Sequence, residues 1–164
     1  MDDYGIAQIC LNGHVKSSKC NDDEINEKFC SICGQGIINK CEKCDTNLKG
    51  SYREVSVIDP PYWYPNRQYQ KPSYCYNCGE PLQWTKLSKE SAYELIELAD
   101  ALNDSEKKEF KNSIDDLILE SPRTNTAVLK FQKFAKKAGT EITKGLRDII
   151  VDLVSETVKK SILS

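Results

Sequence analysis

Apolar residues in the C-terminal half of the chain recur at the three-and-four spacing of amphipathic helices. The pattern predicts four helices, over about 91–102, 106–121, 125–138 and 141–163. Asn103 to Ser105 supply a stop and a cap between the first two, and Pro122 ends the second because proline disfavours helical geometry at the preceding residue. Gly139 ends the third helix. We therefore expect a helical bundle over residues 87–164.

The side chains expected in the core of this bundle form an apolar stripe on each helix. They are Leu95, Ile96, Leu98, Ala99, Leu102, Phe110, Ile114, Leu117, Ile118, Val128, Leu129, Phe131, Phe134, Ala135, Ile142, Leu146, Ile149, Ile150, Leu153, Val154, Val158 and Ile162. Charge is uneven around them: residues 88–122 carry four basic and ten acidic groups, and residues 123–147 carry seven basic and one acidic. The two stretches attract each other if their helices are neighbours. The alternative is that the basic stretch binds an anionic membrane surface or nucleic acid.

The N-terminal half lacks this periodicity and contains all eight cysteines, which lie between Cys10 and Cys78. With 39% hydrophobic residues, 29% charged residues and a net charge of −2, the chain has the composition of a soluble protein, and its bulk charge does not favour nucleic acid. It shows neither a secretory leader nor an apolar run of the roughly 18 residues that span a bilayer. We expect a cytoplasmic protein whose reduced, clustered cysteines bind metal rather than form disulfides.

Four pairs of metal-ligating residues follow one another along the first predicted domain, residues 1–86. They are Cys10 with His14, Cys30 with Cys33, Cys41 with Cys44, and Cys75 with Cys78. Zinc takes four ligands at tetrahedral corners, and two cysteines separated by two residues can reach one ion from a single tight turn. The residue after such a turn often needs a left-handed conformation, which suits Gly34 and Gly79 and is tolerated by Asp45. The spacing therefore predicts zinc binding.

Eight ligands make two closed sites and hence two Zn²⁺ ions. In the sequential grouping, the first two pairs bind one ion and the last two pairs the other. An extended stretch between Cys33 and Cys41 favours this grouping, because it carries the chain over about 20 Å. A tight hairpin there would instead put both central pairs on one ion and leave the first and last pairs for the second. Closed four-ligand sites are structural, so the metal replaces a core that a short, loop-rich segment cannot build.

Catalysis is not expected from these residues. His14 is the single histidine of the chain and is assigned to metal, so no base is left to activate Cys20, which stands outside the pairs. We interpret Cys20 as a surface thiol, with a ligand that replaces His14 and a reactive group as the alternatives. The tetrad DPPY at 59–62 is similar to a motif of adenine amino-methyltransferases, but the chain lacks the parallel-sheet pattern and glycine-rich loop that those enzymes need.

The segments CLNGH, FCSICG, CEKC and YCYNCGEPLQWT resemble a double zinc ribbon, a pair of short antiparallel β-hairpins that hold metal at their turns. The whole chain, including SPRT at 121–124 and DIIVDLVSE at 148–156, is similar to an uncharacterised bacterial family with a zinc-ribbon half and a helical tail. The resemblance implies an α+β protein of the bacterial cytosol, with a double zinc ribbon over 1–86 and about four helices over 87–164. It implies no activity, and Cys20 has no place in the ribbon pattern.

An aromatic and proline-rich insertion, about residues 51–74, separates Cys44 from Cys75. Its first residues, 51–58, alternate in the manner of a strand. Proline stiffening lowers the entropic cost of presenting aromatic and arginine side chains, which are common anchors of protein interfaces. The candidate partner-binding residues are Tyr62, Trp63, Tyr64, Arg67 and Tyr69. The alternatives are that these rings cover the zinc hairpins as a substitute core, or that they stack on single-stranded bases.

Together these patterns favour a non-enzymatic, zinc-stabilised protein-interaction or scaffold module that binds a protein partner or associates with itself. One alternative is a nucleic-acid-binding regulator that uses the zinc-ribbon surface, Arg67, Lys71 and the basic stretch 123–147. A second alternative is a membrane-surface effector that uses the C-terminal amphipathic helices. No small-molecule substrate is evident from the sequence.

Overall fold

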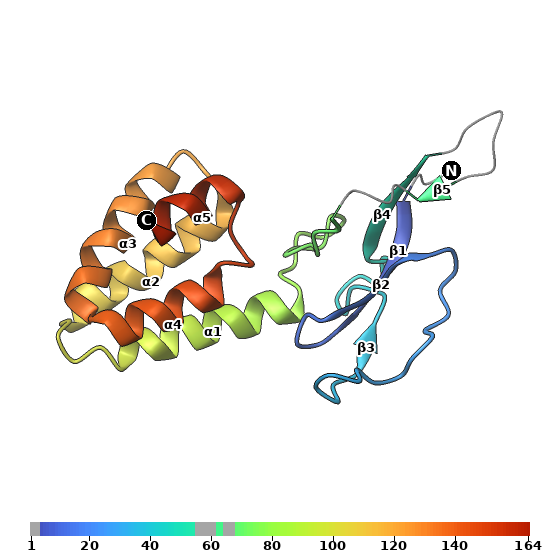
Figure 1. Cartoon of the computed structure of the whole chain (residues 1–164), viewed down its shortest axis with the longest axis horizontal. Coiled ribbons are helices and arrows are strands. Elements are labelled where there is room, and N and C mark those ends of the chain that lie inside the picture. The colour runs from blue at the N-terminus through green and yellow to red at the C-terminus, as the bar shows by residue number, and fades with distance from the viewer. Residues whose placement is uncertain (1–3, 55–61, 64–67) are drawn as a thin grey trace. The chain divides into compact units, whose positions relative to one another are not determined.

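The computed structural model describes residues 4–54, 62–63 and 68–164, and for residues 53–54 and 62–63 it describes the backbone alone. The chain divides into two compact units, Met1–Thr85 and Lys86–Ser164. Short antiparallel strands and turns make up the first unit, and helices make up the second (Figure 1). The predicted α+β class is therefore confirmed.

Among the described residues, five strands form the sheet of the first unit. They are β1 (Tyr4–Cys10), β2 (Val15–Cys20), β3 (Ile37–Ile38), β4 (Lys49–Glu54) and β5 (Tyr62–Trp63). Their order is β2-β1-β4-β5, all pairs are antiparallel, and β3 also pairs with β1. Gly50 lets β4 lie close to its neighbours, because a Cβ there would lie 2.6 Å from the carbonyl oxygen of Gly5 and closer still to that of Ser18.

The apolar core of the first unit is small. Its main cluster consists of Ala7, Ile9, Leu48, Leu82 and Trp84, together with Cys41 and Cys75. The ring nitrogen of Trp84 donates to the carbonyl of Pro72 at 2.8 Å. The hydroxyl of Thr85 donates to the carbonyl of Ser73, also at 2.8 Å. A cluster of this size does not offset the conformational entropy of the roughly 70 residues described in this unit, so the unit needs further cross-links.

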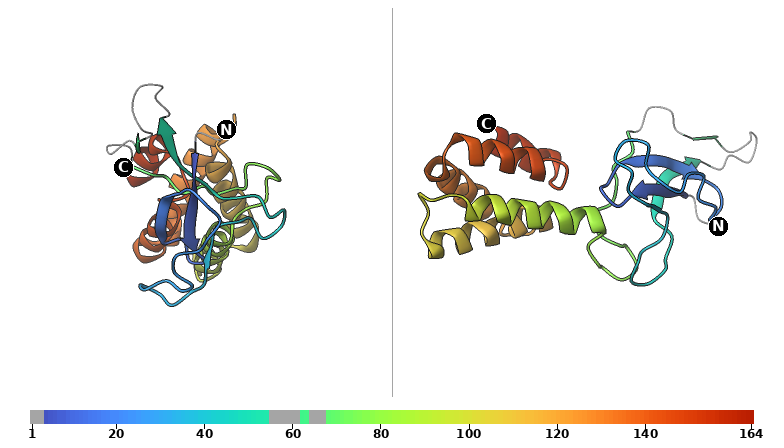
Figure 2. Two further views of the ribbon diagram at one scale, coloured as in Figure 1. Left: turned by 90° about the vertical axis from the view of Figure 1, so that its right-hand side faces the viewer. Right: turned by 90° about the horizontal axis from the view of Figure 1, so that it is seen from below.

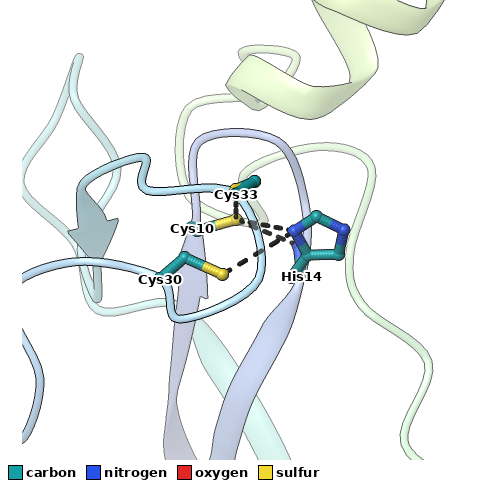
Figure 3. A group of neighbouring side chains, drawn as sticks. All are labelled: Cys10, His14, Cys30 and Cys33. Atoms are coloured by element: carbon teal, nitrogen blue, oxygen red, sulfur yellow. Dashed lines mark hydrogen bonds between the residues drawn. The ribbon is translucent and has the colours of Figure 1, made fainter.

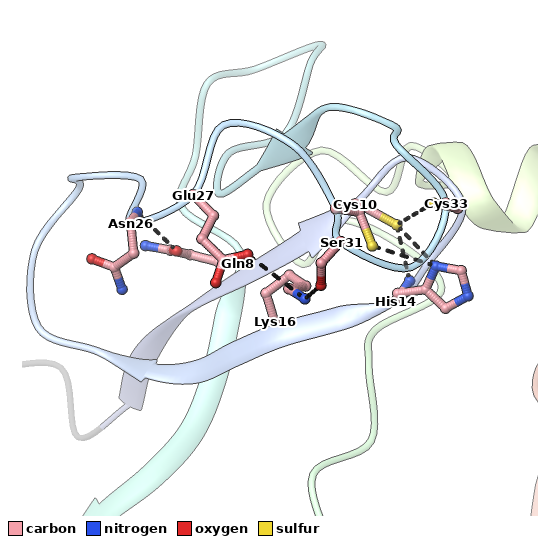
Figure 4. Close-up of polar contacts among 9 residues, drawn as sticks. Gln8, Cys10, His14, Lys16, Asn26, Glu27, Ser31 and Cys33 are labelled. Atoms are coloured by element: carbon pink, nitrogen blue, oxygen red, sulfur yellow. Dashed lines mark hydrogen bonds and ion pairs between the residues drawn. The ribbon is translucent and has the colours of Figure 1, made fainter.

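Two buried amide side chains hold the irregular segment that follows β2. The amide nitrogen of Gln8 donates to the carbonyl of Glu24 at 2.6 Å. The amide oxygen of Gln8 accepts from the backbone of Asn26 at 3.2 Å, as Figure 4 shows. The amide of Asn39 donates to the carbonyl of Asp23 at 2.7 Å. Because each amide is buried and hydrogen-bonded, these contacts fix the segment without any secondary structure of its own.

The second unit is a bundle of helices (Figures 1 and 2). They are α1 (Gln83–Glu97), whose first residues belong to the first unit, α2 (Asp104–Leu119), α3 (Thr124–Ala138), α4 (Thr140–Ile150) and α5 (Glu156–Leu163). At the centre, the ring of Phe110 lies 5.6 Å from that of Phe131 and 5.5 Å from that of Phe134. Among the described helices, none is both long and apolar enough to cross a membrane.

Three details of the helix prediction are wrong. The first helix begins at Gln83 rather than near residue 91, because hydrogen bonds from the side chains of Trp84 and Thr85 hold its first turn in place. Leu98 is 67% exposed, since α1 ends at the residue before it and the chain turns Ala99 inward instead. Leu129 is 66% exposed, because two residues on a helix turn it about 200° away from Phe131.

The predicted single helix over 141–163 is two helices, α4 and α5. Ser155 caps α5, since its hydroxyl accepts from the backbone of Val158 at 3.3 Å. A straight helix over that range would be about 34 Å long, whereas α3 is about 22 Å long. The break lets both pieces pack on α3 and bury Val158 and Ile162.

Among the described residues, the acidic and basic stretches meet at an ion pair between α2 and α3. The ammonium of Lys137 lies 2.7 Å from each carboxylate oxygen of Glu106. Other acidic groups of the first stretch pair within that stretch, as Asp115 does with Lys89 at 2.8 Å. The predicted attraction between the two helices is therefore present, but it uses a small part of the basic charge.

Candidate metal centres

The first ligand cluster lies where the hairpin of β1 and β2 meets the next turn of the chain. Cys10 ends β1, His14 directly precedes β2, and the turn supplies Cys30 and Cys33. Figure 3 shows the four side chains pointing toward one another. Their ligand atoms all lie within 4.8 Å of one another, and Cys10 and Cys30 are buried.

The separations in this cluster fit a tetrahedral zinc ion. Zinc with sulfur about 2.3 Å away and nitrogen about 2.0 Å away places two sulfurs about 3.8 Å apart, and a sulfur and a nitrogen about 3.5 Å apart. The Sγ atom of Cys10 lies 3.7 Å from that of Cys33 and 3.4 Å from Nδ1 of His14. The Sγ atom of Cys30 lies 3.8 Å from the same nitrogen. The histidine thus offers Nδ1, and the sulfurs are far beyond the disulfide bond length of about 2.05 Å.

The second cluster contains cysteines alone. Cys41 and Cys44 come from the turn between β3 and β4, and Cys75 and Cys78 come from the turn before α1. The sulfurs of Cys41 and Cys78 lie 3.7 Å apart, and those of Cys44 and Cys75 lie 3.6 Å apart. The ligands are therefore grouped sequentially. The alternative with both central pairs on one ion is wrong, because the stretch that contains β3 separates those pairs.

Three turns of the same geometry hold the cysteine pairs; we call residues 30–35, 41–46 and 75–80 the cysteine turns. In each, the residue after the second cysteine donates its N–H to the carbonyl of the first. The bonds run from Gly34 to Cys30 at 2.8 Å, from Asp45 to Cys41 at 2.9 Å, and from Gly79 to Cys75 at 2.9 Å. Gly34, Asp45 and Gly79 have φ angles of 72°, 60° and 70°, the left-handed conformation predicted for them.

Hydrogen bonds prepare two cysteines for the thiolate form. The hydroxyl and backbone of Thr46 and the amide of Asn77 lower the pKa of Cys44 to about 6. Burial raises the pKa of Cys30, but hydrogen bonds from the backbone of Ile32 and Cys33 outweigh it and lower the pKa to about 6. Thiolate is the form that binds metal, so these turns favour coordination before an ion arrives.

Crowding acts in the opposite direction at Cys78. The backbone of Glu80 lowers the pKa of Cys78, but burial and the three neighbouring cysteines of the cluster raise it to about 12. Four thiols this close cannot all ionise without a balancing charge. A divalent cation supplies that charge, so metal binding and loss of the last protons are coupled.

Polar contacts outside the ligands join the segments that supply them. Lys16 on β2 donates to the hydroxyl of Ser31 in the first cysteine turn at 2.8 Å and lies 3.7 Å from the carboxylate of Glu27 (Figure 4). At the second cluster, Lys43 lies 2.8 Å from the carboxylate of Glu80, which joins the two turns. Such contacts orient ligands and are expected around a metal centre.

The donor sets fit zinc in a structural role. Three cysteines with one histidine, and four cysteines, are the ligand sets of closed tetrahedral zinc sites. The eight predicted ligands are the residues that would hold two ions. A bound ion would cross-link strands and turns that the small core alone does not hold together. Its four protein ligands would leave no coordination position for water.

Cys20 lies at the end of β2, outside both clusters. Its side chain is 9% exposed, and its sulfur lies 3.3 Å from the hydroxyl of Ser17 and 3.8 Å from the amide of Asn26. The prediction of a surface thiol is therefore wrong, because the segment fixed by the buried amides covers this position. Cys20 belongs to neither group of ligands, so the alternative in which it replaces His14 is also wrong.

Part of the aromatic insertion, residues 55–61 and 64–67, lies outside the described residues. Tyr62 and Trp63 form β5, which pairs with the end of β4, and of these two residues the backbone alone is described. Tyr64 and Arg67 lie outside the described residues, as do residues 55–58 of the predicted strand. Partner binding by these side chains stays a prediction.

The last part of the insertion is held by hydrogen bonds to other parts of the first unit. The hydroxyl of Tyr69 donates to the carbonyl of Lys49 at 2.6 Å, and its ring packs against the small core, where burial raises the pKa of Tyr69. Lys71 donates to the carbonyl of Gly13 at 3.0 Å. Tyr69 therefore contributes to the core, in line with the alternative in which the aromatic rings substitute for one.

Three exposed apolar side chains in or directly before the cysteine turns were missed by sequence reasoning. Phe29 is 67% exposed, Ile32 is 70% exposed and Tyr76 is 66% exposed; we call these the turn-tip residues. Ile32 and Tyr76 lie between two cysteines whose sulfurs point inward, so the intervening side chains point outward. An apolar residue at such a position is the sequence signal that would have found them.

Comparison with known proteins places both units in one family. A family model described as an uncharacterized protein conserved in bacteria (DUF2321) matches residues 3–162. No curated protein and no solved structure matches the chain. The match spans all eight ligands of the two clusters and, except for Leu163, the helices of the bundle.

Proposed function

The chain belongs to this bacterial family, and from that premise we propose that it is a non-catalytic zinc protein whose first unit binds a protein partner. In this proposal two zinc ions hold the sheet and the cysteine turns in place. The turns then present the turn-tip residues to the partner. Zinc acts as a cross-link between segments, and the protein surface does the binding.

Exposure of the turn-tip residues is the observation that carries the proposal. Three large apolar side chains are about two-thirds exposed in a unit whose own core is small. Burying such a side chain in an interface contributes about 1.5–3 kcal/mol. The turns are already fixed by backbone hydrogen bonds and ligands, so a partner binds them with little loss of conformational entropy.

The test compares capture of a partner by full-length, zinc-loaded variants in an extract of the bacterium that encodes the protein. Replacing both Phe29 and Ile32 by alanine should lower the recovery of specific partners at least tenfold, the effect of a central interface residue. Tyr76→Ala tests the second turn separately. Elemental analysis showing two zinc ions in each variant confirms that its fold is retained.

The matched control removes two apolar side chains of equal exposure from the second unit. Leu98→Ala with Leu129→Ala should capture as much partner as the wild type. Trp63→Ala tests the insertion and shows whether the partner also reaches it. Equal recovery by the wild type and by the Phe29 and Ile32 double variant would show that the turn-tip residues bind no partner.

A further inference from the structure

A groove in the second unit lies between α3, α4 and the end of α5. Its volume is about 820 Å³, and the C-terminal part of α3 and one side of α4 form most of its wall. Its lining on α4 follows helical spacing, from Thr140 through Lys144 to Arg147 and Asp148. The groove belongs wholly to the helical bundle, so its binding properties are independent of the zinc clusters and of the turn-tip residues.

Positive charge dominates the wall of this groove. Lys136, Lys144 and Arg147 line it, and Asp148 is the acidic side chain among the described lining residues. None of the three cations forms an ion pair within the described part of the chain. Lys137, the neighbour of Lys136, is paired with Glu106 instead. The described side chains that line the groove therefore carry more positive than negative charge.

One nitrogen of the Arg147 guanidinium is a donor without a hydrogen-bond partner in the described part of the chain. Its Nε atom is buried and has no acceptor among the described residues. A buried donor without a partner costs about 1–3 kcal/mol, so such groups are rare and call for an acceptor. Nε itself is closed off from the groove, whereas Arg147 as a residue lines the wall. The guanidinium therefore brings a positive charge and further N–H donors to the groove.

The start of α4 adds donors to the same wall. The helix begins at Thr140, and Gly139 before it has no side chain to cap the first N–H groups. Helix N-termini favour negative charge because their first N–H groups are unpaired and the helix dipole is positive there. This contribution supplements the arginine and the two lysines and would not by itself define a site.

We propose that this groove binds a phosphate group carried by a small molecule or a lipid headgroup. Cations at Lys136, Lys144 and Arg147 surround the groove from two helices, which suits a dianion with three acceptor oxygens better than a planar carboxylate with one charge. The volume leaves room for more than the phosphate itself. The phosphate is bound by the arginine and the lysines, and the remaining groove accommodates the group that carries it.

The test titrates full-length, zinc-loaded protein with inorganic phosphate at constant ionic strength and follows the Nε–Hε signal of Arg147 by NMR. The signal should shift and saturate, and Arg147→Gln should weaken binding about tenfold. Lys136→Gln and Lys144→Gln should each weaken it about threefold. Both lysines are exposed, so these variants decide the question even if Arg147→Gln does not fold.

Lys130→Gln is the matched control, because it removes an exposed lysine of α3 that does not line the groove. Its affinity for phosphate should stay within about twofold of the wild type. Vesicles of phosphatidylcholine with and without phosphatidic acid separate the two sources: binding to the acidic vesicles alone identifies a lipid headgroup. No saturable binding of either probe, or equal weakening by Lys130→Gln and the groove variants, would overturn the proposal.

Discussion

At the scale of single residues, the position after each cysteine pair shows how one side chain affects backbone strain in a turn. Gly34, Asp45 and Gly79 all adopt left-handed backbone in turns with the same hydrogen bonds. A Cβ is disfavoured in this conformation, although aspartate tolerates it better than most residues. Asp45 therefore carries strain that the two glycines avoid.

We expect Asp45→Gly to stabilise the first unit and Gly79→Ala to destabilise it, each by about 1 kcal/mol. Urea unfolding of the zinc-loaded protein measures both. Gly36→Ala is the control, since Gly36 and Gly79 both have open space around an added Cβ but Gly36 does not have the left-handed backbone. Equal effects of Gly36→Ala and Gly79→Ala would contradict the conformational explanation.

The sequence predicted the ligands and the left-handed positions because ligand spacing and turn geometry are local properties. It did not predict that His14 offers Nδ1, since spacing does not specify how the ring is turned. It also misplaced Cys20, because the burial of that thiol depends on the segment that follows β2, and Gln8 and Asn39 hold this segment through hydrogen bonds between residues far apart in the sequence. Exposure of the turn-tip residues likewise depends on which way each turn faces.

At the scale of elements, local stop signals were more informative than the apolar stripe. The range of α2 was predicted within about two residues, because Asn103 caps its start and Pro122 follows its end. The break between α4 and α5 was missed because the spacing of apolar residues continues across it. Both helices pack against α3, so both need an apolar face with the same spacing. The cap at Ser155 was the signal present in the sequence.

The contact between α2 and α3 predicts a dependence of stability on pH. The hydrogen bond from Lys137, with the backbone of Asn103, lowers the pKa of Glu106 below its ordinary value of 4.5. A carboxyl with a lowered folded-state pKa stabilises the fold above its unfolded pKa, and this contribution is lost as the pH falls through the folded value. Glu106→Gln should therefore lower the urea midpoint of the helical signal at neutral pH, with the difference vanishing in acid.

Glu109→Gln is the control for that measurement, because Glu109 is exposed on the same helix and has no ion pair among the described residues. It should leave the midpoint nearly unchanged at both pH values. A Glu106→Gln variant that was equally destabilised at neutral and acid pH would show that the carboxylate charge is not the cause.

At the scale of the whole molecule, the two units are stabilised by different means. The first relies on two ligand clusters and a small apolar cluster, whereas the second has a core with three phenylalanine rings. Removing metal should therefore affect the units unequally. This difference follows from composition, because all the ligands lie before residue 79 and the regular helical pattern follows them.

We expect a strong chelator to unfold the first unit while most of the helical circular-dichroism signal remains. Cys41→Ser should reduce the zinc content from two equivalents to one, because the first cluster uses none of the ligands of the second. Elemental analysis and circular dichroism measure these outcomes. Loss of both ions on mutation of Cys41, or an unchanged structure without zinc, would contradict the independent structural role of the two clusters.

Sequential grouping of the ligands has a consequence for synthesis on the ribosome. The last ligand of the first cluster, Cys33, is translated before the first ligand of the second, Cys41. The nascent chain can thus complete one coordination sphere before any competing thiol of the other has emerged, and N-terminal segments generally fold first during translation. The order in which the ligands are translated therefore favours the correct distribution of eight ligands between two ions.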